Sequence, residues 1–269
     1  MPRFFDRIKN LIDVEYLAME VRLMIFGLGR FGEYFATLAA LHGIRWIRSL
    51  EPDWTSQENY ASGVPETDIG IPKLAQTAEA LARISPRISF DGEMSSISAE
   101  EPVPDKVVGW LEHATHAALF IDDFSATSAL AKALYRRMPC FFAAALDSGR
   151  TGIIAWSYPG RTPCLDCSAG LSRLQGQPGG QTLFVNVGTT VDFAFQQFLG
   201  VVLQGRLGGD EFAAFADPRY CLAYVINRPG GFIPMAEGRP DLPAGVRLVK
   251  VIDENGRGPS CDVCRGYRP

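Results

Sequence analysis

The sequence has no apolar run that approaches the roughly 18 residues needed for a membrane-spanning helix. It also lacks a basic excess, because 26 Lys and Arg stand against 30 Asp and Glu, for a formal net charge of −4 at pH 7. That balance argues against a nucleic-acid backbone as a partner. Acidic residues interrupt residues 1–17, which is unlike a secretory signal peptide. We therefore expect a cytoplasmic protein that binds neither a membrane nor a nucleic acid.

Cysteine is scarce, with six in the chain, yet four of the six form two C-x-x-C pairs. The pairs are Cys164 with Cys167 and Cys261 with Cys264, separated by residues 168–260. Two thiolates from each pair supply a closed tetrahedral set of four sulfurs, the geometry of structural zinc. The alternatives are two disulfides or four buried free thiols, and nothing in the sequence indicates the oxidising compartment that favours disulfides.

A strand, a glycine-rich turn, a helix and a second strand follow one another near the start of the chain. Residues 21–26 predict a buried strand, residues 33–42 a helix and residues 44–47 a second strand. The turn between the first two carries G-x-G-x-x-G at Gly27, Gly29 and Gly32. In this setting the three glycines suit a tight turn, close backbone approach to a phosphate, and helix–strand packing. The helix N-terminus would offer free amides to an anion.

The rest of the chain continues the alternation. Residues 73–84, 125–137 and 190–203 predict helices, and residues 117–121, 140–146, 152–156, 220–226 and 246–251 predict strands. Residues 91–106, 175–181 and 227–245 are expected to be surface connections. We predict an α/β fold with a Rossmann-like, mostly parallel sheet extended by a second half of strands.

Domain organisation follows from that pattern and from size. With 47% hydrophobic residues, 269 residues can bury a large core in one domain or two coupled lobes. Apolar residues at helical spacing predict an N-terminal helix within residues 1–20. We expect a Rossmann-like half over residues 21–150 and a zinc-containing half over residues 151–269.

Three segments, taken in order, are distinctive beyond this pattern. They are the glycine motif at 27–32, the run T-D-I-G-I-P-K at 67–73 leading into a helix, and T-P-C-L-D-C at 162–167 paired with C-D-V-C at 261–264. On these motifs the chain resembles the ubiquitin-activating-enzyme-like superfamily, the ThiF/MoeB/HesA adenylyltransferases, over about residues 20–265.

The resemblance implies a fold, a reaction and a set of partners. Members bind ATP and magnesium and adenylate the C-terminal carboxylate of a small ubiquitin-like protein, in pathways of ubiquitin-like conjugation or sulfur transfer. The reaction requires neutralised phosphate charge and a carboxylate held in line with the α-phosphorus. It also implies a homodimer or a heterodimer with an active homologue, and a structural zinc on the four cysteines.

Carried onto this chain residue by residue, the family's nucleotide site is altered. Lys73 stands at the family lysine, where an ammonium grips a phosphate oxygen. Counting back without gaps places residues 56–61 on the family's Ser-Asn-x-x-Arg-Gln segment. Gln57 then replaces the asparagine, Tyr60 the arginine and Ala61 the glutamine. Loss of the arginine removes a charge-assisted phosphate contact.

The family's acidic residues are displaced as well. The ribose-binding acid falls on Ser49, with Glu51 as the nearest substitute. Ser125 stands where the metal-binding aspartate is expected, with Asp122 and Asp123 nearby.

Thioester chemistry on a cysteine of the crossover loop is not expected. No cysteine lies between Cys167 and Cys221, and the loop at 175–181 reads QGQPGGQ. Cys221 and Cys140 lie in apolar runs, which favours core packing over a nucleophilic role.

Two functions follow from the resemblance. In one, the chain is a divergent, non-catalytic subunit that binds the C-terminal tail of a ubiquitin-like protein or an active homologue. In the other, it is a working adenylyltransferase whose rearranged site uses Arg30, Lys73 and Asp122 or Asp123. Arg30 replaces a glycine of the phosphate loop, where its side chain either crowds the triphosphate or supplies the missing positive charge.

A third function belongs to another class, the NADP-dependent oxidoreductases with a Rossmann fold. Arg48 and Ser49, expected just after the second strand, would suit a 2′-phosphate. That alternative leaves the cysteine pairs and the run at 67–73 unexplained.

Overall fold

The structure, a computed structural model, covers the chain in several described stretches. The described residues are 8–57, 66–97, 103–146, 149–174, 184–209, 217–227, 245–251, 259 and 261–264. The chain forms two compact units, each discontinuous in sequence. The first holds Met1–Phe120 and Phe195–Ala216, and the second holds Ile121–Ala194 and Asp217–Pro269. These divisions fall at positions other than the residue-150 boundary expected from the sequence.

The first unit is built on four parallel strands. They are β1 (Arg22–Phe26), β2 (Trp46–Leu50), β3 (Ser89–Glu93) and β4 (His116–Leu119), in the order β3-β2-β1-β4. Leu23 of β1 pairs with Ile47 of β2 on one side and with His116 of β4 on the other. The apolar side chains of β1 are fully buried, as expected for a central parallel strand covered on both faces.

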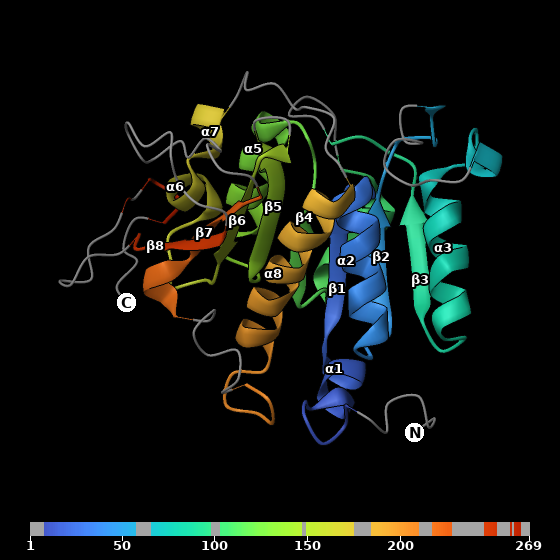
Figure 1. Cartoon of the computed structure of the whole chain (residues 1–269), viewed down its shortest axis with the longest axis horizontal. Helices are drawn as coiled ribbons and strands as arrows, with labels where there is room; N and C mark the ends of the chain where they lie inside the picture. The colour runs from blue at the N-terminus through green and yellow to red at the C-terminus, as the bar shows by residue number, and fades with distance from the viewer. Residues whose placement is uncertain are drawn as a thin grey trace. The chain divides into compact units, whose positions relative to one another are not determined.

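Helices and a 3₁₀ turn accompany these strands in the described part of the unit. They are α1 (Val14–Glu20), α2 (Arg30–Leu41), η3 (Glu66–Asp68), α3 (Lys73–Ile84) and α4 (Asp105–His113). Figure 1 shows α2 in front of β1 and β2, with α3 alongside β3. The bounds predicted for α3 are confirmed, because Pro72 precedes its first residue and the apolar side chains recur at helical spacing.

An aromatic cluster closes the core of the first unit. The long helix α8 (Phe184–Val202) enters this unit at Phe195. Phe195 and Phe198 each place their rings edge-on to Phe35 of α2, with centroids 5.3 and 5.5 Å apart. Such edge-to-face pairs are worth about 0.5–1.5 kcal/mol beyond the area they bury.

The second unit is antiparallel. Its strands are β5 (Cys140–Leu146), β6 (Thr151–Ser157), β7 (Leu222–Ile226) and β8 (Gly245–Val249), in that order. Among its described residues, this unit also holds α5 (Phe124–Leu134), α6 (Leu165–Ala169), α7 (Leu171–Leu174), the first part of α8 and η6 (Pro218–Tyr220). Cys140 and Cys221 are completely buried, which confirms the prediction that they belong to the core.

The predicted fold class is confirmed, and the structure corrects several of its elements. The second strand is β2 at Trp46–Leu50, two residues later than expected at its start. The expected surface connection at 91–106 contains the end of β3 and the start of α4. The N-terminal helix begins at Val14. Asp13 caps it, because its side chain accepts a hydrogen bond from the Tyr16 amide at 2.9 Å.

The two long connections predicted at 175–181 and 227–245 lie almost wholly outside the described residues. Among the helices that the structure describes, none has both the length and the apolar character to cross a membrane.

Candidate functional site

The glycine turn links β1 to α2 in the first unit. Gly27 has φ of 90°, a conformation that side chains rarely adopt, and its amide donates to the Leu50 carbonyl at 2.9 Å. A Cβ on Gly32 would lie 1.9 Å from the Gly27 carbonyl oxygen, so the helix approaches the turn too closely for any side chain there. Gly29 differs, because a Cβ there would meet no protein atom within 4 Å. The space beside Gly29 is therefore open, whereas the space beside Gly32 is filled by the backbone of the turn.

Glu51 follows the last residue of β2 and holds this turn. Its carboxylate accepts hydrogen bonds from the Leu28 amide and, at 3.0 Å, from the Asp53 amide. The residue is 3% exposed, and burial raises the pKa of its carboxyl despite the nearby Lys73 ammonium. Ser49, the ungapped position for the family's ribose acid, is buried within β2 and donates to the Ile25 carbonyl at 3.0 Å.

Lys73 is the first residue of α3 and points its ammonium at two carboxylates. Its Nζ lies 2.8 Å from Asp53 Oδ2 and 3.6 Å from Glu51 Oε1. The side chain is only 15% exposed, so this pairing is less screened than one at the surface. The lysine of the T-D-I-G-I-P-K run is thereby placed next to the glycine turn.

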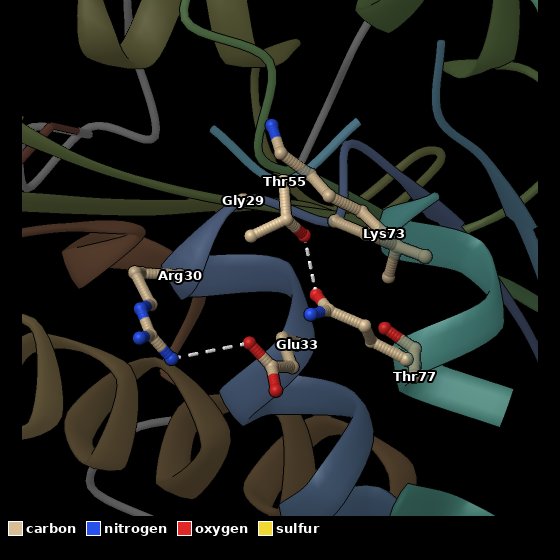
Figure 2. A pocket seen from close by; sticks show the side chains of 8 residues that line it. Gly29, Arg30, Glu33, Thr55, Lys73 and Thr77 are labelled. Atoms are coloured by element: carbon tan, nitrogen blue, oxygen red, sulfur yellow. Dashed lines mark hydrogen bonds and ion pairs between the residues drawn. The ribbon is translucent and has the colours of Figure 1, made fainter. Parts of the chain in front are cut away.

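A hollow opens between the glycine turn, the start of α2 and the start of α3. It is lined by Leu28, Gly29, Arg30, Glu33, Thr55, Lys73, Gln76 and Thr77. Figure 2 shows the Arg30 guanidinium directed at Glu33, with Nη1 and Oε2 3.3 Å apart, and Lys73 on another side. Thr55 donates to Gln76 Oε1 at 2.5 Å. Burial lowers the pKa of Arg30.

The structure thus brings together most of the predicted nucleotide-site residues. Gly29, Arg30 and Lys73 line one pocket, and Glu51 holds the turn beside it. Asp122 is an exposed residue of the second unit, and its role stays a prediction. Residues 58–61, which carry the family's Arg-Gln positions, lie outside the described residues.

Asp123, the neighbour of Asp122, is the N-cap residue of α5. Its Oδ1 accepts from the amides of Ser125 and Ala126 at 2.7 and 3.1 Å.

Several polar residues at or beside the pocket were not singled out from the sequence. Glu33, Thr55, Gln76 and Thr77 line it, and Asp53, two residues after Glu51, pairs with Lys73. The one available signal was the E-P-D run immediately after β2, which places two carboxylates at the carboxyl end of a parallel strand.

The placement of Arg48 and Ser49 removes the feature that suggested NADP. Both lie inside β2 rather than after it. The Arg48 guanidinium donates to the Ser89 carbonyl at 2.5 Å and lies 4.5 Å from the centre of the Trp46 ring.

The four predicted metal ligands converge in the second unit. The sulfur atoms of Cys164, Cys167, Cys261 and Cys264 all lie within 4.8 Å of one another. Three of the separations are 3.6–3.7 Å. Four sulfurs at a Zn–S distance of about 2.3 Å would be about 3.8 Å apart in a regular tetrahedron. The donor set and its spacing therefore fit zinc.

Local backbone structure positions the cysteines of both pairs. Cys164 immediately precedes α6, and the Cys261 amide donates to the Cys264 sulfur at 3.3 Å. The hydrogen bond between the two sulfurs lowers the pKa of Cys164 and raises that of Cys167, so the pair favours one thiolate before a metal binds. Tyr135 packs against the cluster.

A lysine lies beside the cysteine cluster. Lys132 of α5 has its Nζ 2.8 Å from Asp166 Oδ2, within the C-L-D-C run. The hydrogen bond with Asp166 raises the pKa of Lys132, and the charges of Cys261 and Cys164 act in the same direction. The Asp166 carboxylate also accepts from the Ser172 amide at 2.9 Å, which ties α7 to the same run.

Comparison with solved structures shows the same fold. E. coli MccB with AMPCPP and selenomethionine-labelled MccA is 15% identical, with a TM-score of 0.67 over 93% of this chain and 68% of that one. E. coli MccB with ATP is 16% identical, with a TM-score of 0.66 over 93% and 69%. PaaA is 13% identical, with a TM-score of 0.60 over 83% and 77%.

Sequence comparison addresses the family directly. No curated protein matches the chain. The model of the ThiF family matches residues 15–202, a stretch that begins in α1, includes the glycine turn, Lys73 and the first cysteine pair, and ends with α8. Because that stretch is well over half of the 269 residues, the chain belongs to the ThiF family.

Proposed function

We propose that this protein activates the C-terminal carboxylate of a peptide or small ubiquitin-like protein by ATP-dependent adenylation. One observation carries the proposal: Gly29 and Lys73 line the same pocket, and the space at Gly29 is open. Membership of the ThiF family supports it. So does the fold shared with MccB, which has been solved with ATP and with MccA.

The proposed reaction is a nucleotidyl transfer. A carboxylate oxygen of the substrate attacks the α-phosphorus of ATP, the bond between that phosphorus and the bridging oxygen to the β-phosphorus breaks, and pyrophosphate leaves. The product is a mixed anhydride of the acyl group and AMP. Positioning and charge stabilisation supply most of the catalysis in such transfers.

The residues of the pocket suit this task. The open position at Gly29 lets phosphate oxygens approach the amides at the start of α2. Lys73 supplies an ammonium that moves from Asp53 to a phosphate oxygen. Glu51 fixes the Leu28 amide and so the shape of the turn. Magnesium, when bound, would neutralise phosphate charge.

The cysteine cluster has a structural role in this proposal. Four thiolates leave no open coordination position for a reacting group. Zinc held by Cys164, Cys167, Cys261 and Cys264 would fasten the segment around α6 to the turn at 261–264.

The partner would be a chain with a free C-terminal carboxylate. We infer that this partner is a ubiquitin-like protein or a shorter peptide, and that the enzyme works as a dimer, either with itself or with an active homologue. A subunit that only holds such a tail, without adenylating it, is the competing function within the same family.

Exchange of radiolabelled pyrophosphate into ATP tests the proposal. The protein is mixed with ATP, magnesium and candidate tails, each synthesised with a free carboxylate and with a C-terminal amide. Exchange that requires the free carboxylate and disappears in Lys73→Ala supports adenylation. Lys106→Ala is the matched control, because that lysine also pairs with two carboxylates, Asp91 and Glu93, yet does not line the pocket.

Other outcomes point elsewhere. Binding of a free-carboxylate tail without any exchange would replace adenylation by the tail-holding function. Tight NADPH binding with hydride transfer would overturn both.

A further inference from the structure

Both cations that line the pocket are already paired with carboxylates of the same unit. Arg30 Nη1 lies 3.3 Å from Glu33 Oε2, and Lys73 Nζ lies 2.8 Å from Asp53 Oδ2. Figure 2 shows the Arg30 side chain bent toward Glu33 along the first turn of α2. A polyanion that enters must therefore compete with carboxylates for these cations.

Of the two cations, Arg30 has the geometry that suits phosphate better. Its guanidinium is planar and presents parallel N–H groups that match two oxygens of a phosphate, whereas an ammonium acts as a point charge. Arg30 is the first residue of α2, directly after Gly29, so its side chain starts beside the open position of the turn. The side chain is 17% exposed, so a pair made there is incompletely screened by water.

Glu33 opposes an anion in the same place. It lines the pocket, and its carboxylate is held one helical turn from Arg30. A carboxylate and a phosphate within one small hollow repel each other, and both seek the same guanidinium. The pair thus has two alternative arrangements, one for the empty pocket and one for the loaded pocket.

We propose that Arg30 recognises the phosphates of the nucleotide, and that Glu33 holds its guanidinium while the pocket is empty and is displaced on binding. This inference rests on the proposed function, because it assumes that a nucleoside triphosphate enters the pocket. It makes Arg30 a phosphate-binding residue in its own right. Glu33 becomes a competitor that sets nucleotide affinity.

Titration calorimetry with ATP and magnesium tests the exchange in four proteins: the unaltered chain, Arg30→Met, Glu33→Gln and the double variant. Arg30→Met is expected to weaken ATP binding roughly 10- to 100-fold, the range for losing a hydrogen-bonded charge pair. Glu33→Gln is expected to strengthen it about threefold, because a partly exposed ion pair contributes little free energy. The double variant should bind far more weakly than Glu33→Gln alone, because the guanidinium that Glu33 would release is absent.

A matched control is available on the next helix. Glu79 pairs with Arg83 on α3 at 2.5 Å, and both side chains are mostly exposed and do not line the pocket. Glu79→Gln removes the same kind of helical ion pair and should leave ATP affinity unchanged. Thermal unfolding checks that every variant, including Glu79→Gln, is folded.

The outcomes separate the two proposals. ATP binding that is lost in Lys73→Ala but unchanged in Arg30→Met would refute the role of Arg30 and leave the proposed function standing. Weaker binding in Glu33→Gln would show that Glu33 positions the guanidinium rather than competing for it, which also overturns the exchange. If the unaltered folded protein binds no ATP, both proposals fail.

Discussion

Two glycines of the turn, three residues apart, should respond to alanine in opposite ways. At Gly32 a methyl group would be driven into the Gly27 carbonyl oxygen, 1.9 Å from the ideal Cβ position. Backbone occupies that space, and Gly27 is itself fixed by its hydrogen bond to Leu50, so neither neighbour moves easily. At Gly29 the methyl group would enter the open pocket instead.

The expected stability changes differ accordingly. Overpacking of a closed site costs about 1–3 kcal/mol and occasionally more, so Gly32→Ala should lower Tm by roughly 2–12 °C. Gly29 has φ of −57°, which alanine also adopts, and restricting the unfolded chain stabilises by about 0.4–1 kcal/mol. Alanine caps a helix less well than glycine by a similar amount, so Gly29→Ala should change stability by less than about 1 kcal/mol.

ATP affinity should respond to the substitution at Gly29, the glycine whose replacement changes stability less. Gly29→Ala is expected to weaken ATP binding at least about tenfold, or about 1.4 kcal/mol, because the methyl group blocks phosphate from the turn amides. Thermal unfolding by circular dichroism and calorimetric titration with ATP, on the same samples, measure both effects. An unchanged Tm in Gly32→Ala would refute the packing argument. Unchanged ATP affinity in a folded Gly29→Ala protein would refute the assignment of the open position to phosphate.

Three further predictions concern the cysteine cluster and the buried carboxylate of Glu51. Cys264→Ser should abolish zinc binding, as measured by elemental analysis. It should also lower the free energy of unfolding by about 4–5 kcal/mol, the chain-entropy value for a cross-link that closes a loop of roughly 100 residues. Full zinc content in this variant would contradict the four-sulfur site. Lys132→Met should speed zinc transfer to a chromogenic chelator about tenfold, whereas Lys132→Arg should not, because the positive charge near the thiolates is lost only in the first. Burial raises the pKa of Glu51, so its contribution to stability is present below the ordinary glutamate pKa of about 4.3 and is lost as pH rises through the folded-state value. The free energy of unfolding of Glu51→Gln, relative to the unaltered protein, should therefore grow between about pH 4 and pH 7 in denaturant titrations, whereas a constant difference would contradict the raised pKa.

Features set by local sequence were predictable. α3 spans Lys73–Ile84 as predicted, because a proline before it and apolar residues at helical spacing act within a few residues. The convergence of the four cysteines also follows from spacing and thiolate chemistry, without knowledge of the intervening fold.

Features set by tertiary contacts were not predictable. β3 carries Ser89, Asp91 and Glu93 and reads as a polar loop, yet its backbone pairs with β2. Glu33 and Thr55 meet at one pocket only because α2 and the segment after β2 are brought together by the sheet. The ungapped count falls on Ser49, which lies inside β2, because a count along the sequence does not register the residue at which a strand ends.

The discontinuity of the two units bears on how the protein is made. Phe195 and Phe198 complete the aromatic cluster around Phe35, but they are synthesised well after the strands they help to cover. The cysteine cluster likewise waits for Cys264, which follows Cys167 by 97 residues. Because domains generally fold from the N-terminal side as synthesis proceeds, neither unit can reach its final core on a ribosome that has released only the first half. A nascent chain stalled before residue 195 would hold a first unit without its closing aromatic side chains and a second unit without β7 and β8, and each would be a target for chaperones or proteases.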